Sequence, residues 1–135
     1  MRGERHLTRP QQYALVYSRG GSWASESVVM KALPNGLPLS RHGLSVSKRV
    51  GNAVTRNKVK RRLREIMRQA PVKPGWDMVF IARPAAARAD YAGLKAAVEK
   101  LLVRARLLVV DRGPGPEAEV TAGSTTARGP IDEGT

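Results

Sequence analysis

The sequence of 135 residues contains no cysteine, which excludes disulfide bonds and thiolate metal sites. No apolar run approaches the ~18–20 residues that a membrane-spanning helix needs. The N-terminus carries no apolar signal segment, so we expect a cytoplasmic protein. Hydrophobic residues make up 41% of the chain, which is compatible with one globular domain and a modest core.

Acidic residues are scarce before the C-terminal end. Residues 1–110 contain six acids, which lie on separate predicted elements: Glu4, Glu26, Glu65, Asp77, Asp90 and Glu99. His6 and His42 are far apart in the sequence and lack metal-ligand spacing, so each is expected at the surface or at a strand edge. A protein phosphodiesterase would need clustered carboxylates for metal ions or a histidine pair for acid–base chemistry. The sequence therefore predicts neither catalytic residues nor a metal site.

Positive charge dominates the chain. The formal net charge is +13, which indicates a polyanionic partner, either nucleic acid or an anionic membrane. Residues 111–135 hold five acids against two arginines, a net charge of −3, so residues 1–110 carry +16. Residues 111–135 are also rich in glycine, proline, serine and threonine. We therefore predict a disordered tail at 111–135 after one folded domain at 1–110.

The most regular part of the chain is the basic stretch 48–68, which holds nine Lys/Arg and one acid, Glu65. Helical periodicity separates its residues into two sides. The apolar side holds Val59, Leu63, Ile66, Met67 and Ala70. The opposite side holds Asn57, Lys60, Arg61, Arg64 and Arg68. We predict a helix that ends near residue 69, is capped by Asn52 or Thr55, and offers its basic face to a polyanion.

Periodicity and turn residues predict the remaining elements. These are a helix at 9–19, strands at 27–33, 42–47 and 77–83, and a last helix at 90–107 that Asp90 can cap. The first two strands are expected to form an antiparallel hairpin across Pro34, Asn35 and Gly36. The order helix–strand–strand–helix–strand–helix predicts an α+β fold with a small mixed sheet.

The basic stretch and its flanks resemble a known family. Ser45-Val46-Ser47-Lys48-Arg49-Val50-Gly51-Asn52-Ala53-Val54, followed by Arg56-Asn57, Lys60-Arg61, Arg64-Glu65 and Arg68, resembles the signature of the bacterial ribonuclease P protein subunit. The N-terminal pattern Leu7, Tyr13, Val16, Tyr17 and Gly20 is also similar to that family. The resemblance covers about residues 5–108 and leaves out the tail.

The resemblance implies a ribosomal protein S5 domain 2-like fold, in which the signature helix makes a left-handed βαβ crossover. General rules favour a right-handed crossover instead. It also implies a function in tRNA maturation. The family's protein pairs with a large catalytic RNA, and the particle removes the 5′ leader of precursor tRNA. The RNA supplies the active site, and Mg²⁺ supports the chemistry. Neither a membrane contact nor an obligate protein partner is expected.

The resemblance also assigns roles to residues. The candidate contacts to the catalytic RNA are Lys48, Arg49, Arg56, Asn57, Lys60, Arg61, Arg64 and Arg68. Tyr13 and Tyr17 match positions at which the family's aromatic rings line a cleft for the single-stranded leader. An aromatic ring stacks on any base, so such a cleft tolerates different leader sequences. Lys31, on the first predicted strand, stands where members of the family can carry an aromatic residue, so it would replace stacking with a contact to a leader phosphate. Alternatively, both tyrosines only pack the first helix on the sheet, as we expect for Trp23 and Trp76 at strand ends.

Two other functions remain open at this point. Composition alone allows a general basic module for ribosomal RNA or DNA, which would not prefer precursor over mature tRNA. An autonomous nuclease would cleave RNA with metal ions and no added RNA subunit. The scattered acids argue against the nuclease, and the long signature favours the subunit of a tRNA-processing particle.

Overall fold

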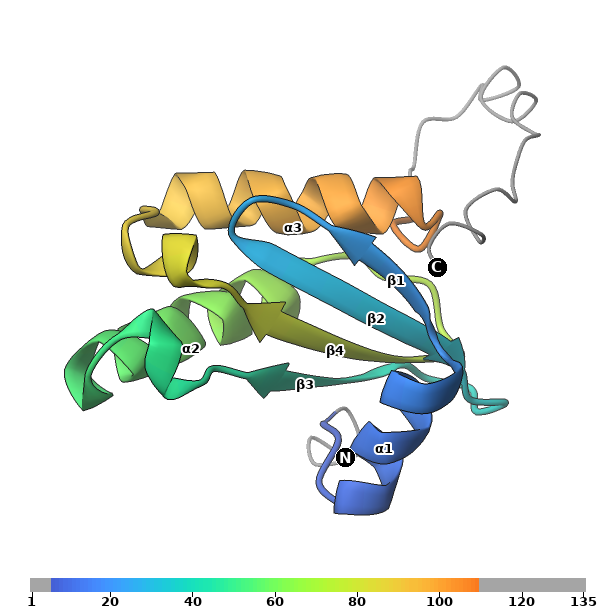
Figure 1. Cartoon of the computed structure of the whole chain (residues 1–135). Coiled ribbons are helices and arrows are strands. Elements are labelled where there is room, and N and C mark those ends of the chain that lie inside the picture. Colours follow the sequence, from blue (N-terminus) through green and yellow to red (C-terminus); the bar gives the residue numbers. More distant parts are fainter. Residues whose placement is uncertain (1–5, 110–135) are drawn as a thin grey trace, which may run out of the picture.

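The computed structural model describes residues 6–109 (Figure 1). In chain order the elements are α1 (Pro10–Arg19), β1 (Gly21–Ala24), β2 (Val28–Pro34), β3 (Arg41–Ser45), the 3-10 helix η2 (Lys48–Val50), α2 (Ala53–Gln69), β4 (Trp76–Ala82), the 3-10 helix η3 (Pro84–Ala87) and α3 (Tyr91–Arg104). The predicted α+β class is confirmed. The predicted disordered tail, 111–135, lies outside the described residues.

The sheet has the strand order β1-β2-β4-β3, in which only the pair β3–β4 is parallel. The predicted hairpin between strands 27–33 and 42–47 is wrong, because β4 lies between β2 and β3. β4 takes this central position because it is apolar over its middle, where Met78, Val79 and Phe80 are all buried. The hairpin partner of β2 is instead β1, a four-residue strand that the sequence analysis missed.

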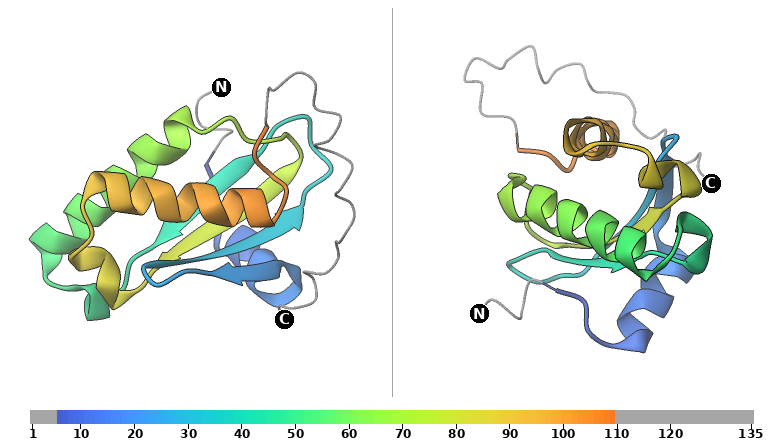
Figure 2. Two further views of the ribbon diagram at one scale, coloured as in Figure 1. Left: turned by 90° about the horizontal axis from the view of Figure 1, so that it is seen from above. Right: turned by 90° about the vertical axis from the view of Figure 1, so that its left-hand side faces the viewer.

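The parallel pair β3–β4 requires a crossover connection, and α2 makes it. The views of Figures 1 and 2 together give this connection the left-handed sense that the resemblance implies. As a result, α2 and α3 cover one face of the sheet while α1 lies on the other (Figure 2). A right-handed connection would have carried α2 over the face that α1 occupies.

The main core lies between the sheet and the helices α2 and α3. It confirms the apolar side predicted for α2, since Val59, Leu63, Ile66 and Met67 are at most 5% exposed. Burial of each such side chain contributes ~1.5–3 kcal/mol, which fixes the rotation of α2 about its axis. The two tryptophans, Trp23 and Trp76, pack at the edge of this core, as predicted.

A smaller cluster holds α1 on the opposite face of the sheet, where Leu7, Val16 and Val79 are buried together. The Tyr13 ring packs beside them and lies directly over Gly43 of β3, where a Cβ atom would overlap the ring. The position of α1 therefore depends on this close approach of an aromatic ring to the strand backbone.

The predicted helix caps are present, and a buried ion pair secures the loop between β2 and β3. The Asn52 side chain accepts from the Thr55 amide of α2, and the Asp90 side chain accepts from the Gly93 amide of α3. Asp77 is 6% exposed. It accepts two hydrogen bonds from the Arg41 guanidinium, at 2.8 and 2.7 Å, and one from the Asn35 amide at 2.8 Å.

Candidate nucleic-acid interface

The outward side of α2 gathers the cations that the periodicity predicted. Asn57, Arg61, Arg64 and Arg68 are exposed there, and Lys60 is half-buried. Within residues 6–109, the single ion pair made by α2 joins Arg68 to Glu65. Arg61 and Arg64 therefore have no acidic partner in that range. Like charges at helical spacing destabilise a helix, so a polyanion bound on this side relieves their repulsion.

Arg68 differs from its neighbours because it already has a carboxylate partner. Its Nη2 donates to Glu65 Oε2 at 2.5 Å, and the Gln69 amide donates to the same oxygen at 2.6 Å. The hydrogen bond from Arg68 lowers the pKa of Glu65, so this carboxylate stays charged at neutral pH. A phosphate that binds Arg68 must therefore compete with Glu65.

Two arginines of α2 are engaged in structural contacts. Arg56 Nη1 donates to the Gly51 carbonyl at 2.9 Å, which ties the first turn of α2 to the bend before it. Arg62, which the sequence analysis did not single out, donates to the Ala89 carbonyl at 2.8 Å and joins α2 to the segment before α3. Both side chains are half-buried. Arg56 is therefore less available to RNA than the exposed Arg61 and Arg64, which form no ion pair in the described part of the chain.

The start of α2 extends the positive surface. Lys48 and Arg49 are exposed on η2, and the Ser47 hydroxyl accepts from the Arg49 amide. They precede the N-terminal end of α2, where the helix dipole is positive and the first amides lack helical partners. Side-chain charge and backbone dipole thus add at this end, which suits an anionic partner.

The structure brings together the two histidines that are far apart in the sequence. The His6 and His42 rings lie 4.8 Å apart, because the N-terminal segment forms a bridge along β3. Burial lowers the pKa of His42 to about 4, with smaller effects from His6 and Arg64, so His42 is neutral at pH 7. No three His, Asp or Glu side chains within 6–109 are grouped closely enough to hold a metal ion.

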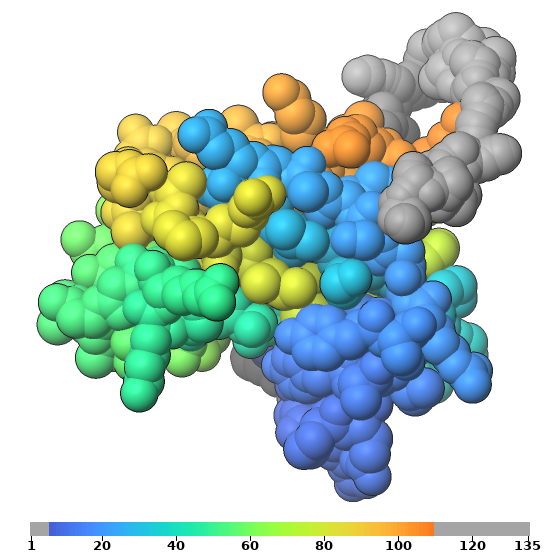
Figure 3. Space-filling model, viewed as in Figure 1, coloured from blue at the N-terminus to red at the C-terminus, as the bar shows by residue number. Residues whose placement is uncertain are grey.

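A second concave surface lies on the α1 face of the sheet. Figure 3 shows it between α1, in blue, and the green segment of η2 and α2. Of the two tyrosines on α1, Tyr17 is 41% exposed, whereas Tyr13 is half-buried and its hydroxyl donates to the Leu7 carbonyl at 3.4 Å. The two predicted tyrosines therefore have different environments. Tyr13 packs α1 on the sheet, and Tyr17 keeps a large part of its ring open to a ligand.

The strands add residues to this second surface. Lys31 is half-buried on β2 and pairs across the sheet with Val79, which α1 covers. Strand alternation puts Val29 and Ile81 on the same face, beside each other in register and half-buried. The sequence analysis missed both, although the spacing of two residues from Lys31 was the signal that could have found Val29.

Comparison with known proteins decides between the functions that the sequence analysis left open. A model of the Ribonuclease P family matches residues 1–106. The chain belongs to the ribonuclease P protein family. The ribonuclease P protein component of Dehalococcoides mccartyi is 47% identical over 108 residues, which cover 80% of this chain and 90% of that relative. The component of Caldanaerobacter subterraneus is 44% identical over 103 residues, or 75% of this chain and 89% of the relative.

Solved ribonuclease P proteins share the fold. A Staphylococcus aureus ribonuclease P protein mutant with defective mRNA degradation activity has a TM-score of 0.75 at 30% identity, and the match covers 80% of this chain and 93% of the other. The Thermotoga maritima protein has a TM-score of 0.68 at 31% identity, over 73% of this chain and 96% of the other. The predicted fold, including its similarity to ribosomal protein S5 domain 2, agrees with these structures.

Family membership confirms the predicted function as the protein component of ribonuclease P and implies association with ribonuclease P RNA. The activity is that of the ribonucleoprotein. A general basic module for ribosomal RNA or DNA is not favoured. None of the helices within residues 6–109 has the length and apolar character to cross a membrane.

Proposed function

We propose that this chain binds ribonuclease P RNA through the basic side of α2 and binds the 5′ leader of precursor tRNA in the concave surface beside α1. The RNA supplies the catalytic centre in this proposal. The protein positions the leader so that the particle cleaves at the mature 5′ end of the tRNA. The observation that carries the proposal is the row of exposed cations on α2 without acidic partners in the described part of the chain.

The electrostatics of α2 support the contact to the RNA. Phosphates that replace the counterions of Arg61, Arg64 and the entrance residues Lys48 and Arg49 release those ions into solution. Binding to RNA should then weaken steeply with added salt. Asn57 is exposed on the same side and offers both a donor and an acceptor, so it suits a phosphate or a base edge.

The placement of Tyr17 and Lys31 supports the contact to the leader. A single-stranded leader offers unpaired bases to an exposed ring and phosphates to a lysine, and neither contact requires a particular sequence. The two surfaces lie on opposite faces of the sheet, since α1 covers one face and α2 the other (Figure 2). One protein can therefore contact the catalytic RNA and the leader at the same time.

We assign Mg²⁺ to the RNA and the substrate. Cleavage of a phosphodiester by metal ions needs ligands that converge on one point. Among the described acids, Glu65 is paired with Arg68, Asp77 with Arg41, and Asp90 caps α3. These three carboxylates serve the fold, which supports the proposal that the partner RNA carries the chemistry.

The test is cleavage of 5′-labelled precursor tRNA at low Mg²⁺ concentration by bacterial ribonuclease P RNA, with and without this protein. We expect cleavage at the mature 5′ end to depend on the protein and to vanish when the RNA is omitted. Cleavage without the RNA would place the active site in the protein. Binding to the RNA with no change in rate would overturn the role in processing and leave only RNA binding.

A further inference from the structure

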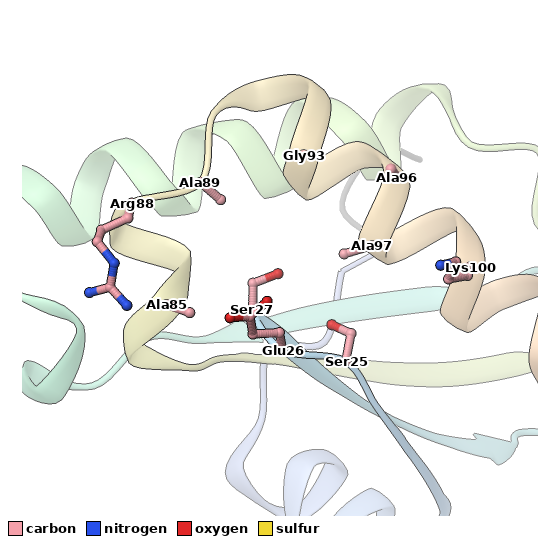
Figure 4. A pocket seen from close by; sticks show the side chains of 10 residues that line it. All are labelled: Ser25, Glu26, Ser27, Ala85, Arg88, Ala89, Gly93, Ala96, Ala97 and Lys100. Carbon is pink, nitrogen blue, oxygen red and sulfur yellow. The ribbon is translucent and has the colours of Figure 1, made fainter.

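A cavity on a third side of the molecule is not used by the proposed function. It lies between the turn that joins β1 and β2, the helix η3, and the first half of α3, and its volume is about 470 Å³. This volume falls within the range of ~300–1,000 Å³ that is typical of small-ligand sites. Figure 4 shows that one wall consists of small side chains from η3 and α3, among them Ala85, Ala89 and Ala97.

Apart from Ser25, the polar side chains that line this cavity have no hydrogen-bond or ion-pair partner within the described part of the chain. Ser27 is 8% exposed, and no hydrogen bond within residues 6–109 engages its hydroxyl, which faces the cavity in Figure 4. The side chains of Glu26, Arg88 and Lys100 likewise make no hydrogen bond or ion pair within that range. By contrast, the hydroxyl of Ser25 both donates to and accepts from the Val28 backbone. The Ser27 hydroxyl keeps some contact with solvent, so it can exchange a water molecule for a hydrogen bond to a ligand.

The arrangement of charges restricts the ligand. Figure 4 shows Arg88 and Lys100 at opposite ends of the cavity, with Glu26 and Ser27 between them. A simple anion in the middle would be repelled by Glu26, and a monophosphate would reach only one of the two cations. A nucleotide within a strand has a phosphate on each side of its sugar, and its base has a flat apolar face and a polar edge.

We propose that this cavity binds one nucleotide that carries a phosphate on both its 5′ and 3′ sides. The base lies against the small side chains of α3, the phosphates pair with Arg88 and Lys100, and Glu26 and Ser27 contact the edge of the base. A carboxylate accepts from the exocyclic amino group of cytosine, while uracil presents a carbonyl oxygen at that position. The site therefore prefers cytosine to uracil. Its source is an unpaired nucleotide of bound RNA or a free nucleoside bisphosphate.

The direct test uses the full chain alone and cytidine 3′,5′-bisphosphate as the probe, followed by the NMR amide shifts of the protein at constant ionic strength. We expect saturable shifts at Ser27, Gly93 and Ala97, and binding at least about fivefold weaker for the uridine probe. Shifts confined to α2, or equal responses to inorganic phosphate, would overturn the proposal. Glu26→Gln should reduce the preference for cytidine.

Matched variants on α3 separate the cavity from the rest of the surface. Ala97→Leu fills the cavity and should abolish saturable binding, whereas Ala92→Leu, at an exposed position outside the cavity, should preserve it. Lys100→Ala should weaken binding, whereas Lys95→Ala, which removes the same charge outside the cavity, should not. Equal effects within either pair would overturn the proposal. The lysine pair keeps the test valid if Ala97→Leu disturbs the fold.

The RNA source rests on the proposed function, and a second measurement addresses it separately. If the nucleotide comes from ribonuclease P RNA, Lys100→Ala should weaken assembly with that RNA more than Lys95→Ala. If only the bisphosphate probe is affected, the free nucleotide is the ligand. The titration of the protein alone needs neither the RNA nor cleavage. Failure of the cavity site and failure of the tRNA-processing function are therefore distinguishable.

Discussion

Arg62 and Arg64 are two residues apart on the same basic helix, and the structure predicts opposite consequences for their replacement by alanine. Arg64 is exposed and forms no ion pair within residues 6–109. If it neutralises one phosphate, Arg64→Ala should reduce the slope of log K against log salt concentration by ~0.7–0.9. The free energy of unfolding should change little, because a substitution at an exposed position is usually within ~0.5 kcal/mol.

Arg62→Ala should show the reverse pattern. Its guanidinium is half-buried and donates to the Ala89 carbonyl at 2.8 Å. A hydrogen bond from a charged group contributes ~1.5–3 kcal/mol, and partial exposure reduces this to about 1–2 kcal/mol. For a domain of this size the melting temperature should fall by ~4–8 °C per kcal/mol. The salt slope should stay at its original value, since the side chain points toward α3.

The assay for both variants is filter binding to ribonuclease P RNA at several salt concentrations, together with thermal unfolding of each free protein. The two variants have the same net charge, so a difference between them reports position alone. The reasoning is refuted if Arg62→Ala lowers the salt slope as much as Arg64→Ala does. It is also refuted if Arg64→Ala leaves the slope unchanged, because the basic side of α2 would then not be the interface.

Four further predictions concern other sites. Tyr17→Ala should weaken binding of precursor tRNA but not of mature tRNA by ~1–3 kcal/mol, measured with the assembled particle; unfolding of the domain would show instead that Tyr17 only packs. Asp77→Ala leaves Arg41 half-buried and unpaired, so the free energy of unfolding, measured with urea, should fall by ~3–5 kcal/mol. A fall below ~1 kcal/mol would contradict the role of this ion pair. Because the pKa of His42 is lowered to about 4 in the folded protein, the unfolded chain binds a proton first as the pH falls. Stability should therefore decrease between pH ~6.5 and ~4, by at most ~3 kcal/mol, and His42→Gln should remove this dependence. Glu65→Gln removes the carboxylate partner of Arg68, so RNA binding should be tighter than that of the unchanged protein at low salt, and the difference in affinity should shrink at high salt. Weaker binding would show instead that the ion pair orients Arg68 for RNA.

The local features of α2 and α3 could be predicted because they depend on neighbouring residues. The apolar side of α2 repeats at spacings of three and four, and burial against the sheet followed that repeat. The caps Asn52 and Asp90 precede their helices directly, and both accept the expected backbone hydrogen bonds. The strand order could not be predicted in this way. The turn after β2 resembles a hairpin turn, but β4, which is about 40 residues further along the chain, competes successfully for the same edge.

The candidate sites also have features that the sequence predicts and features that only packing decides. The charge and the spacing of the basic helix were sufficient to predict a surface for a polyanion, but they could not distinguish Arg62, which supports the segment before α3, from Arg64, which faces solvent. In the same way, Tyr13 and Tyr17 lie one helical turn apart, and the sequence gives no reason to treat them differently. Only the contact of the Tyr13 ring with Gly43 shows that Tyr13 belongs to the packing of the fold, while Tyr17 stays exposed. The cavity beside α3 had no signal in the sequence, because its lining comes from the β1–β2 turn, η3 and α3.

The sequence by itself determined the family, the polyanionic partner and the helices, because charge, periodicity and a long signature are properties of consecutive residues. The tertiary structure alone decided which strands pair, on which face of the sheet α2 lies, and which arginines and tyrosines remain available to a ligand. These outcomes depend on competition between distant segments for burial and for backbone hydrogen bonds. That competition is resolved only when the whole chain has packed.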